Sequence, residues 1–117
     1  MRVTPDNELG FRGLTVKQPW ASQIAAGTKR IEYRSWGTDY RGDLLITASA
    51  SPRTQGPHSC AICVIELVDT IWTDDDVEWV LARPRAVRPV PVRGRLQLWP
   101  VSDELVRELG LLLIRSA

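Results

Sequence analysis

The segment CAICVIELVDTIW at residues 60–72 constrains the fold more than any other part of this sequence, because it is almost continuously apolar. Its β-branched residues favour a strand, and it is shorter than the roughly 20 apolar residues of a membrane-spanning helix. A strand that is apolar on both faces needs cover on both faces. Glu66 interrupts the pattern near its middle, so we expect a long strand that is covered or closes a barrel, with one acid to explain.

Shorter strands are predicted around this segment from alternation of apolar and polar residues. They are expected at residues 14–16, 30–35 and 43–50. The proline-rich stretch 89–101 is expected to begin as an edge strand, because proline cannot donate to a strand ladder, and to continue as a central strand.

Helices are predicted near each end of the chain. Pro19 suits a first helical turn and Gly27 a helix end, so a helix is expected at about 19–26. The segment SDELVREL at 102–109 has a serine cap and is expected to be the terminal helix. Thr73 and the acids after it predict a further short helix or helical turn at 73–79.

These elements favour the α+β class. Five or six short strands do not alternate regularly with long helices, which argues against a doubly wound parallel sheet. We expect a small, barrel-like sheet of mixed strands with short peripheral helices. The 117 residues suit one domain, which we place at 13–117, after a loose lead-in at 1–12.

The composition is that of an ordinary globular protein, with 44% hydrophobic and 25% charged residues and a net charge of +1. No polybasic tail is present, and the first ten residues lack the apolar core of a secretory signal. A cytoplasmic location, with no membrane contact, is therefore expected. The sequence leaves the oligomeric state open.

The two cysteines form a single CxxC, Cys60 and Cys63, with no second pair and only His58 nearby. Positions three apart on a strand face opposite sides, so a shared zinc site is not expected. We interpret them as two buried thiols and expect neither a metal nor a cofactor.

The stretch GTKRIEYRSW at 27–36 carries an unusual charge for a half-buried strand. Alternation places Arg30, Glu32 and Arg34 on one face, with Glu32 and Arg34 about 7 Å apart along the strand. Their long side chains, with Lys29 from the preceding turn, can converge on one small ligand. The alternative is a solvated strand face with Glu32 paired to an arginine, which stabilises little.

Lysine is rare in this chain: every basic residue other than Lys17 and Lys29 is arginine. A lysine that remains in such a background suits a position that needs a compact ammonium able to release a proton, which guanidinium cannot do.

Several blocks of the sequence resemble the ASCH domain, a small member of the PUA-like superfamily. They are LTVKQPWASQIAAGTKRIEYRSW, YRGDLLITASA and VIELVDT, in that order, with RPRAVRPVPVRGRLQLWPV similar to the closing segment of some members. The family motif has a proline and an aromatic residue opening a short helix, followed by G-x-K-x-x-E-x-R. It is matched by Pro19, Trp20, Gly27, Lys29, Glu32 and Arg34. The resemblance covers about residues 13–101.

The resemblance implies a PUA-like barrel with a cleft that takes RNA or a nucleotide-like or nucleoside-like ligand. The chemistry agrees: arginine forks hold phosphate or a base edge, a carboxylate accepts from an exocyclic amine, and aromatic rings stack on bases. The expected binding residues are Lys17, Trp20, Lys29, Glu32, Tyr33, Arg34 and Arg41.

Two enzymatic alternatives stay open. One bacterial branch of the family deacetylates acetylated cytidine with a Lys, a Thr and a Glu. Its Lys falls on Lys29 and its Thr on Glu32, which is a departure, and its Glu has candidates only by location, at Asp74, Asp75, Asp76 and Glu78. Lys29 and Glu32 are then the catalytic candidates. Other members are described as ribonucleases, which need an acid or base near the scissile phosphate and cations for its developing charge. Lys29, Arg34 and Tyr33 supply suitable types, but the only histidine, His58, is expected in an exposed loop.

Further hypotheses concern the remaining charges. Glu66 must find a cation or point into a cleft, which makes it a candidate second carboxylate of the site. The five arginines between Arg83 and Arg95 suit either RNA contact or a solvated surface. Some ASCH domains are parts of transcription coactivators, so a protein partner is a third class of function.

Overall fold

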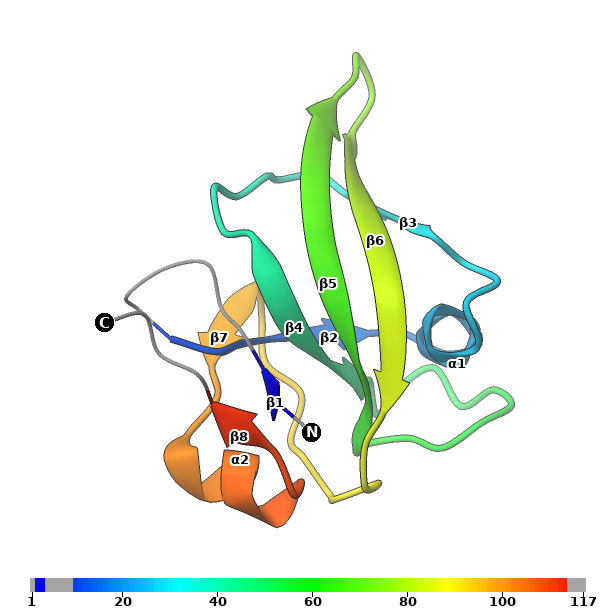
Figure 1. Ribbon diagram of the computed structural model, residues 1–117. Helices are drawn as coiled ribbons and strands as arrows, with labels where there is room; N and C mark the ends of the chain where they lie inside the picture. Colours follow the sequence, from blue (N-terminus) through cyan, green and yellow to red (C-terminus); the bar gives the residue numbers. More distant parts are fainter. Residues whose placement is uncertain (1, 4–9, 114–117) are drawn as a thin grey trace.

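The computed structural model describes residues 2–3 and 10–113. Its main element is a mixed six-stranded sheet with the strand order β3-β6-β5-β4-β2-β7 (Figure 1). The strands are β2 (Arg12–Val16), β3 (Ile31–Arg34), β4 (Gly42–Ala48), β5 (Ala61–Trp72), β6 (Val77–Ala86) and β7 (Leu98–Pro100). The helices are α1 (Trp20–Ala26) and α2 (Asp103–Glu108), and β1 (Arg2–Val3) pairs with β8 (Leu112–Leu113).

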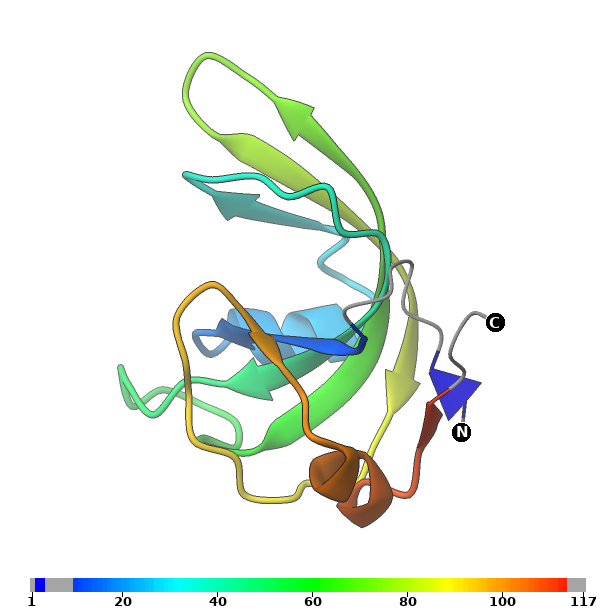
Figure 2. The same ribbon diagram turned by 90° about the vertical axis from the view of Figure 1, so that its left-hand side faces the viewer.

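The sheet curves into a half-barrel around α1 (Figure 2). This confirms the α+β fold class with mixed strands and short peripheral helices. Parallel pairing joins β2 to β4, while β5 pairs antiparallel with β4 and β6. No helix in the described part of the chain is long and apolar enough to cross a membrane.

The core lies on both faces of β5. On the concave face Ile65 and Leu67 pack in one cluster with Ile24 of α1. On the other face Val64 packs with Phe11 and with residues of the α2 region. The expected two-sided cover of this strand is therefore confirmed for its first half.

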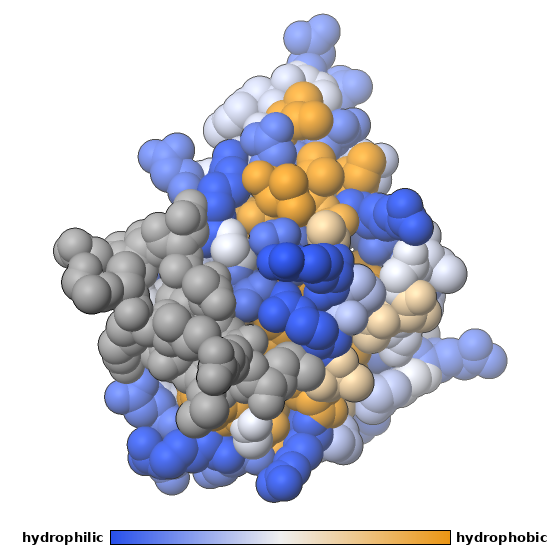
Figure 3. All heavy atoms as spheres, viewed as in Figure 1, coloured by the Kyte–Doolittle hydropathy of each residue, from blue (hydrophilic) through white to orange (hydrophobic). Residues whose placement is uncertain are grey.

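The second half of β5 extends beyond the core with β6 as a hairpin. Val68, Ile71 and Trp72 are exposed there, and Figure 3 shows apolar side chains gathered over this part of the two strands. The expectation that the whole segment 60–72 is covered was wrong, because the neighbouring strands are shorter than β5.

The helix or helical turn expected at 73–79 is absent, and that prediction was wrong. Thr73 and Asp76 close the β5–β6 hairpin instead, since the Thr73 amide donates to the Asp76 carbonyl at 2.9 Å and the Asp76 amide donates to Thr73 Oγ1 at 3.1 Å. From Val77 onward buried and less buried residues alternate, with Val77 and Trp79 in the core. The alternation of buried and less buried residues from Val77 onward makes this segment a strand, while Thr73 and Asp76 form the turn before it.

The stretch 89–101 also differs from expectation. Its proline-rich part makes one isolated bridge, Pro91 to Cys60, and its last part is β7, which pairs only with β2 and forms a sheet edge. The prediction of a central strand was wrong, because no described strand of the six-stranded sheet pairs with the side of β7 that faces away from β2. The predicted helices are confirmed: α1 ends at Gly27, whose φ of 80° is left-handed, and Ser102 caps α2 through the Leu105 amide.

The expected lead-in of residues 1–12 differs from the structure at its end. Phe11 is buried in the core at 1% exposure, and Arg12 already belongs to β2. Residues 4–9 of that lead-in lie outside the described residues.

Candidate functional site

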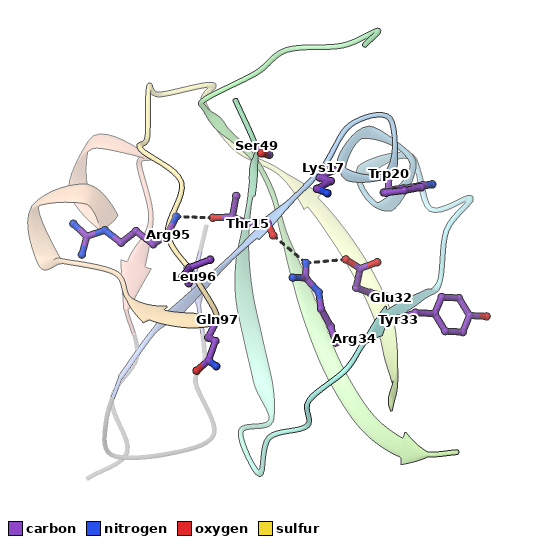
Figure 4. A pocket seen from close by; sticks show the side chains of 10 residues that line it. All are labelled: Thr15, Lys17, Trp20, Glu32, Tyr33, Arg34, Ser49, Arg95, Leu96 and Gln97. Atoms are coloured by element: carbon purple, nitrogen blue, oxygen red, sulfur yellow. Dashed lines mark hydrogen bonds and ion pairs between the residues drawn. The ribbon is translucent and has the colours of Figure 1, made fainter. Parts of the chain in front are cut away.

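A pocket of about 350 Å³ opens where β3 and β2 are not joined by strand pairing (Figure 4). We call it the β2–β3 pocket. Thr15 and Lys17 line it from β2 and the residue after it, Trp20 from the start of α1, and residues 32–34 from β3. Ser49 and the loop 95–97 complete its wall. The described structure thus brings five of the predicted binding residues into one concavity.

Glu32 forms the centre of this site. Its side chain is 9% exposed, and its two carboxylate oxygens face two cations: Arg34 Nη2 lies 2.9 Å from Oε2, and Lys29 Nζ lies 3.6 Å from Oε1. A buried carboxylate needs such partners to offset its loss of hydration. Glu32 is thus paired to an arginine, as the alternative expected, but it is buried and does not lie on a solvated strand face.

Arg34 joins the two sides of the opening. The same Nη2 group that contacts Glu32 donates to the backbone carbonyl of Thr15 at 2.9 Å. Figure 4 shows this guanidinium lying between Thr15 and Glu32. Arg34 is thus both a wall of the pocket and a link that fixes β3 against β2.

The aromatic residues at the site are half-exposed. Trp20 is 47% and Tyr33 52% exposed, and Lys29 Nζ lies 5.2 Å from the centre of the Tyr33 ring. The alternation predicted for β3 is confirmed within residues 31–34, with the charged Glu32 buried and Tyr33 outward, whereas Arg30 precedes the strand and does not line the pocket. Exposed rings beside a polar floor can stack on a flat ligand.

Lys29 is set beside the pocket and not in its wall. It follows the turn at Gly27, reaches Glu32 with its ammonium, and faces a second concavity on its other side. Lys17 lines the pocket itself, is exposed, and makes no ion pair with any described residue.

Five lining residues were not predicted as binding residues: Thr15, Ser49, Arg95, Leu96 and Gln97. Thr15 Oγ1 accepts a hydrogen bond from the Arg95 amide at 3.1 Å, across 80 residues of sequence. The Arg95 guanidinium lies over the Trp99 ring and points away from Glu32 (Figure 4), while Leu96 is 92% exposed. The excess of arginine in residues 83–95 could have indicated that this segment binds a ligand. No local sequence pattern, however, predicts that the loop 95–97 packs against β2.

Arg41 is not brought to the pocket. Its guanidinium donates to the carbonyls of Thr38 and Tyr40 and to Thr70 Oγ1 at 2.9 Å, and it pairs with Asp69. These contacts hold the chain before β4 against β5. The structure therefore gives Arg41 a positioning role in the fold at a distance from the residues of the pocket.

Glu66 does not line the pocket either. Its carboxylate accepts from Arg83 Nη2 at 2.7 Å, and the neighbouring Asp43 is paired with Arg85. This contact with Asp43 raises the pKa of Arg85, so its charge is secured. Arg83 and Arg85 are therefore engaged by carboxylates of the protein itself. Of the five arginines between Arg83 and Arg95, Arg95 alone lines the β2–β3 pocket.

The remaining candidates lie elsewhere. Asp74, Asp75 and Asp76 are in the tip of the β5–β6 hairpin, and Glu78 follows in β6 beside Tyr33. The imidazole of His58 contacts the carbonyls of Ser49 and Thr54 within its loop, where the residue is half-buried rather than exposed. None of these side chains lines the β2–β3 pocket.

The two cysteines are free and buried, as expected. Burial raises the pKa of the Cys60 thiol and raises that of Cys63 to about 12, so both stay protonated at neutral pH. Among the described residues, no three His, Cys, Asp or Glu side chains gather in a way that suits a metal ion.

Comparisons with known proteins identify the family of this chain. The sequence profile of the ASCH domain matches residues 14–90. Activating signal cointegrator 1 from Homo sapiens is 54% identical over 44 residues, which are 35% of this chain and 8% of that protein. The Mus musculus protein of the same name is 51% identical over 43 residues, or 34% of this chain and 7% of its own. The chain thus spans less than a tenth of these relatives.

Solved structures match over most of the chain. An ASCH protein from Zymomonas mobilis superimposes with a TM-score of 0.68, covering 87% of this chain and 94% of its own, at 12% identity. A point variant of that protein gives the same TM-score, covering 88% and 96%. At this identity the likeness concerns the fold alone.

Proposed function

Because this chain belongs to the ASCH domain family, we propose that its β2–β3 pocket binds single-stranded RNA or a nucleoside-like ligand. The observation that carries the proposal is the buried Glu32 carboxylate, held between Arg34 and Lys29 at the floor of a pocket with exposed aromatic rings. Each carboxylate oxygen has more than one acceptor site, so Glu32 can bind a ligand donor while it keeps its cations.

The parts of the pocket correspond to the parts of a nucleotide. Glu32 accepts from an exocyclic amine of a base, and Trp20 offers a ring face on which that base stacks. Lys17, exposed and without an ion-pair partner among the described residues, meets a phosphate at the mouth. Stacking on one aromatic ring contributes about 1–3 kcal/mol per base.

Fluorescence anisotropy with a labelled six-nucleotide RNA of mixed sequence tests the proposal. We expect salt-dependent binding that weakens in Lys17→Ala and Trp20→Ala, two exposed positions whose loss should leave the fold intact. Arg107→Ala, an exposed arginine on α2 away from the pocket, is the matched charge control. Equal binding by all four proteins would refute the assignment of RNA to this pocket. Gel analysis of the same RNA detects a ribonuclease, because a ribonuclease shortens it.

A second candidate is an amidohydrolase that deacetylates acetylated cytidine. The observation in its favour is the Lys29 ammonium 3.6 Å from the Glu32 carboxylate beside the pocket, since a lysine and an acid in contact can share proton transfer. Incubation with acetylated cytidine and mass spectrometry of released cytidine tests it. Release by the wild type and not by Lys29→Ala would establish this activity, and no release from either would exclude it for this substrate.

A further inference from the structure

A second cavity lies beside the first, between the end of α1 and β6. It has a volume of about 480 Å³, and we call it the α1–β6 pocket. Buried apolar side chains face it, namely Ile24, Ile65 and Leu81. Its wall also carries Lys29, Arg30 and Arg83. An apolar floor with charges at the edge suits a flat organic body that bears a charged group.

The charges of this pocket have one sign. Among the described residues that line it, every charged side chain is a cation. Arg83 is occupied by Glu66, and Lys29 faces Glu32. Arg30 is exposed, and no hydrogen bond or ion pair of its side chain occurs with the described residues. Arg30 is therefore the cation available to an anionic ligand.

Lys29 connects the two pockets. It lines the α1–β6 pocket, while its ammonium lies 3.6 Å from Glu32, which lines the β2–β3 pocket. Its position over Tyr33 adds a second contact with the wall of the first pocket. A ligand group that lies over Lys29 would thus contact both pockets, and the Lys29 ammonium supplies a positive charge between them.

We infer that the α1–β6 pocket is a second nucleotide subsite, which takes the nucleotide next to the one bound in the β2–β3 pocket. The phosphate between them lies on Lys29 and Arg30, and the ribose or base covers the apolar floor. This inference rests on the proposed function and narrows it: the ligand that fills both pockets is a single RNA strand of at least two unpaired nucleotides, whereas a free nucleoside fills the first pocket alone. Cationic side chains that follow the backbone beside aromatic rings are typical of single-strand binding.

Ala26 permits a sharp test, because it is exposed and lines only this subsite of the two. Ala26→Glu places a carboxylate in the path of the phosphate, and Ala26→Gln adds the same bulk without charge. We expect Ala26→Glu to bind the labelled six-nucleotide RNA about tenfold more weakly than Ala26→Gln, because like charges repel across an interface. Binding of free cytidine, which needs the first pocket alone, should be equal in the two variants.

Arg30→Ala gives an independent measurement. Loss of one phosphate contact should lower the slope of log affinity against log salt by about 0.7 for single strands. Arg107→Ala, which removes an exposed arginine from α2, should keep the wild-type slope. Thermal unfolding checks that the variants are folded.

The outcomes separate the two proposals. If Ala26→Glu and Arg30→Ala bind the RNA like wild type while Lys17→Ala and Trp20→Ala weaken it, the second subsite is refuted and RNA binding in the first pocket stands. If wild type binds neither the RNA nor cytidine at low salt, the proposed function is refuted and the second subsite with it.

Discussion

The guanidinium of Arg34 in β3 donates to the backbone carbonyl of Thr15 in β2 at 2.9 Å, across the opening that strand pairing leaves between them. The same nitrogen contacts Glu32. One side chain therefore substitutes for the missing strand contact and fixes the charge pattern of the pocket. Any substitution of Arg34 must be judged on stability as well as on binding.

Arg34→Lys is predicted to destabilise the protein although it keeps the charge. The lysine side chain is one atom shorter than that of arginine, so its ammonium cannot reach the position from which Arg34 Nη2 donates to both Thr15 and Glu32. We expect a loss of about 1.5–3 kcal/mol in the free energy of unfolding, measured in urea, which is the scale of one hydrogen bond to a charged group. Arg107→Lys on α2 is the control. A stability equal to wild type would contradict the bridging role.

Glu32→Gln is predicted to change base preference more than affinity. The carboxylate accepts but cannot donate, so it favours bases that present an amine, whereas a glutamine amide can turn to offer either group. Competition between cytidine-rich and uridine-rich six-nucleotide RNAs should show a cytidine preference in the wild type that falls in the variant, by about 1 kcal/mol for one hydrogen bond. A preference that is unchanged in Glu32→Gln would remove Glu32 from base contact. Glu104→Gln on α2 controls for net charge.

Gly13→Ala should destabilise the strand that carries Thr15. A methyl group at this position would lie 2.3 Å from the ring of Trp99, which is buried at 5% exposure. Overpacking of this kind costs about 1–3 kcal/mol. In a double-mutant cycle, the cost should shrink in a Trp99→Leu background, where the ring is gone. Equal costs in both backgrounds would show that the strain arises elsewhere.

The stability of the protein should fall at high pH through Cys63. Burial raises its pKa to about 12 from an ordinary value of 9.0, so the folded state holds the proton more tightly than the unfolded state. The resulting stabilisation is complete below about pH 9 and is lost as pH rises toward 12, at up to about 1.4 kcal/mol per pH unit. Urea unfolding from pH 8.5 to 10.5 measures the slope. Cys63→Val should have a shallower slope, and identical slopes would refute the assignment.

Local patterns predicted most of the secondary structure. Proline and glycine located the ends of α1, the serine cap located α2, alternation located β3, and the almost continuous apolar run located β5. Prediction failed at residues 73–79, where a threonine and acids that suit a helix start also suit a hairpin turn. The hydrogen bonds between Thr73 and Asp76 show that these residues form the hairpin turn and not a helix start. The choice between a helix and a hairpin turn at residues 73–79 depends on the pairing of β6 with β5, which is a tertiary contact.

The sequence by itself determined the family motif and the chemistry available to the pocket, because Lys29, Glu32 and Arg34 lie within six residues on one turn and one strand. The tertiary structure decided which other residues join them. Thr15 and Arg95 meet across 80 residues, Arg41 and Glu66 are engaged elsewhere, and Lys29 stands between two cavities. The reason is physical: a strand's own period fixes which side chains share a face, but strand pairing and loop closure fix what that face meets.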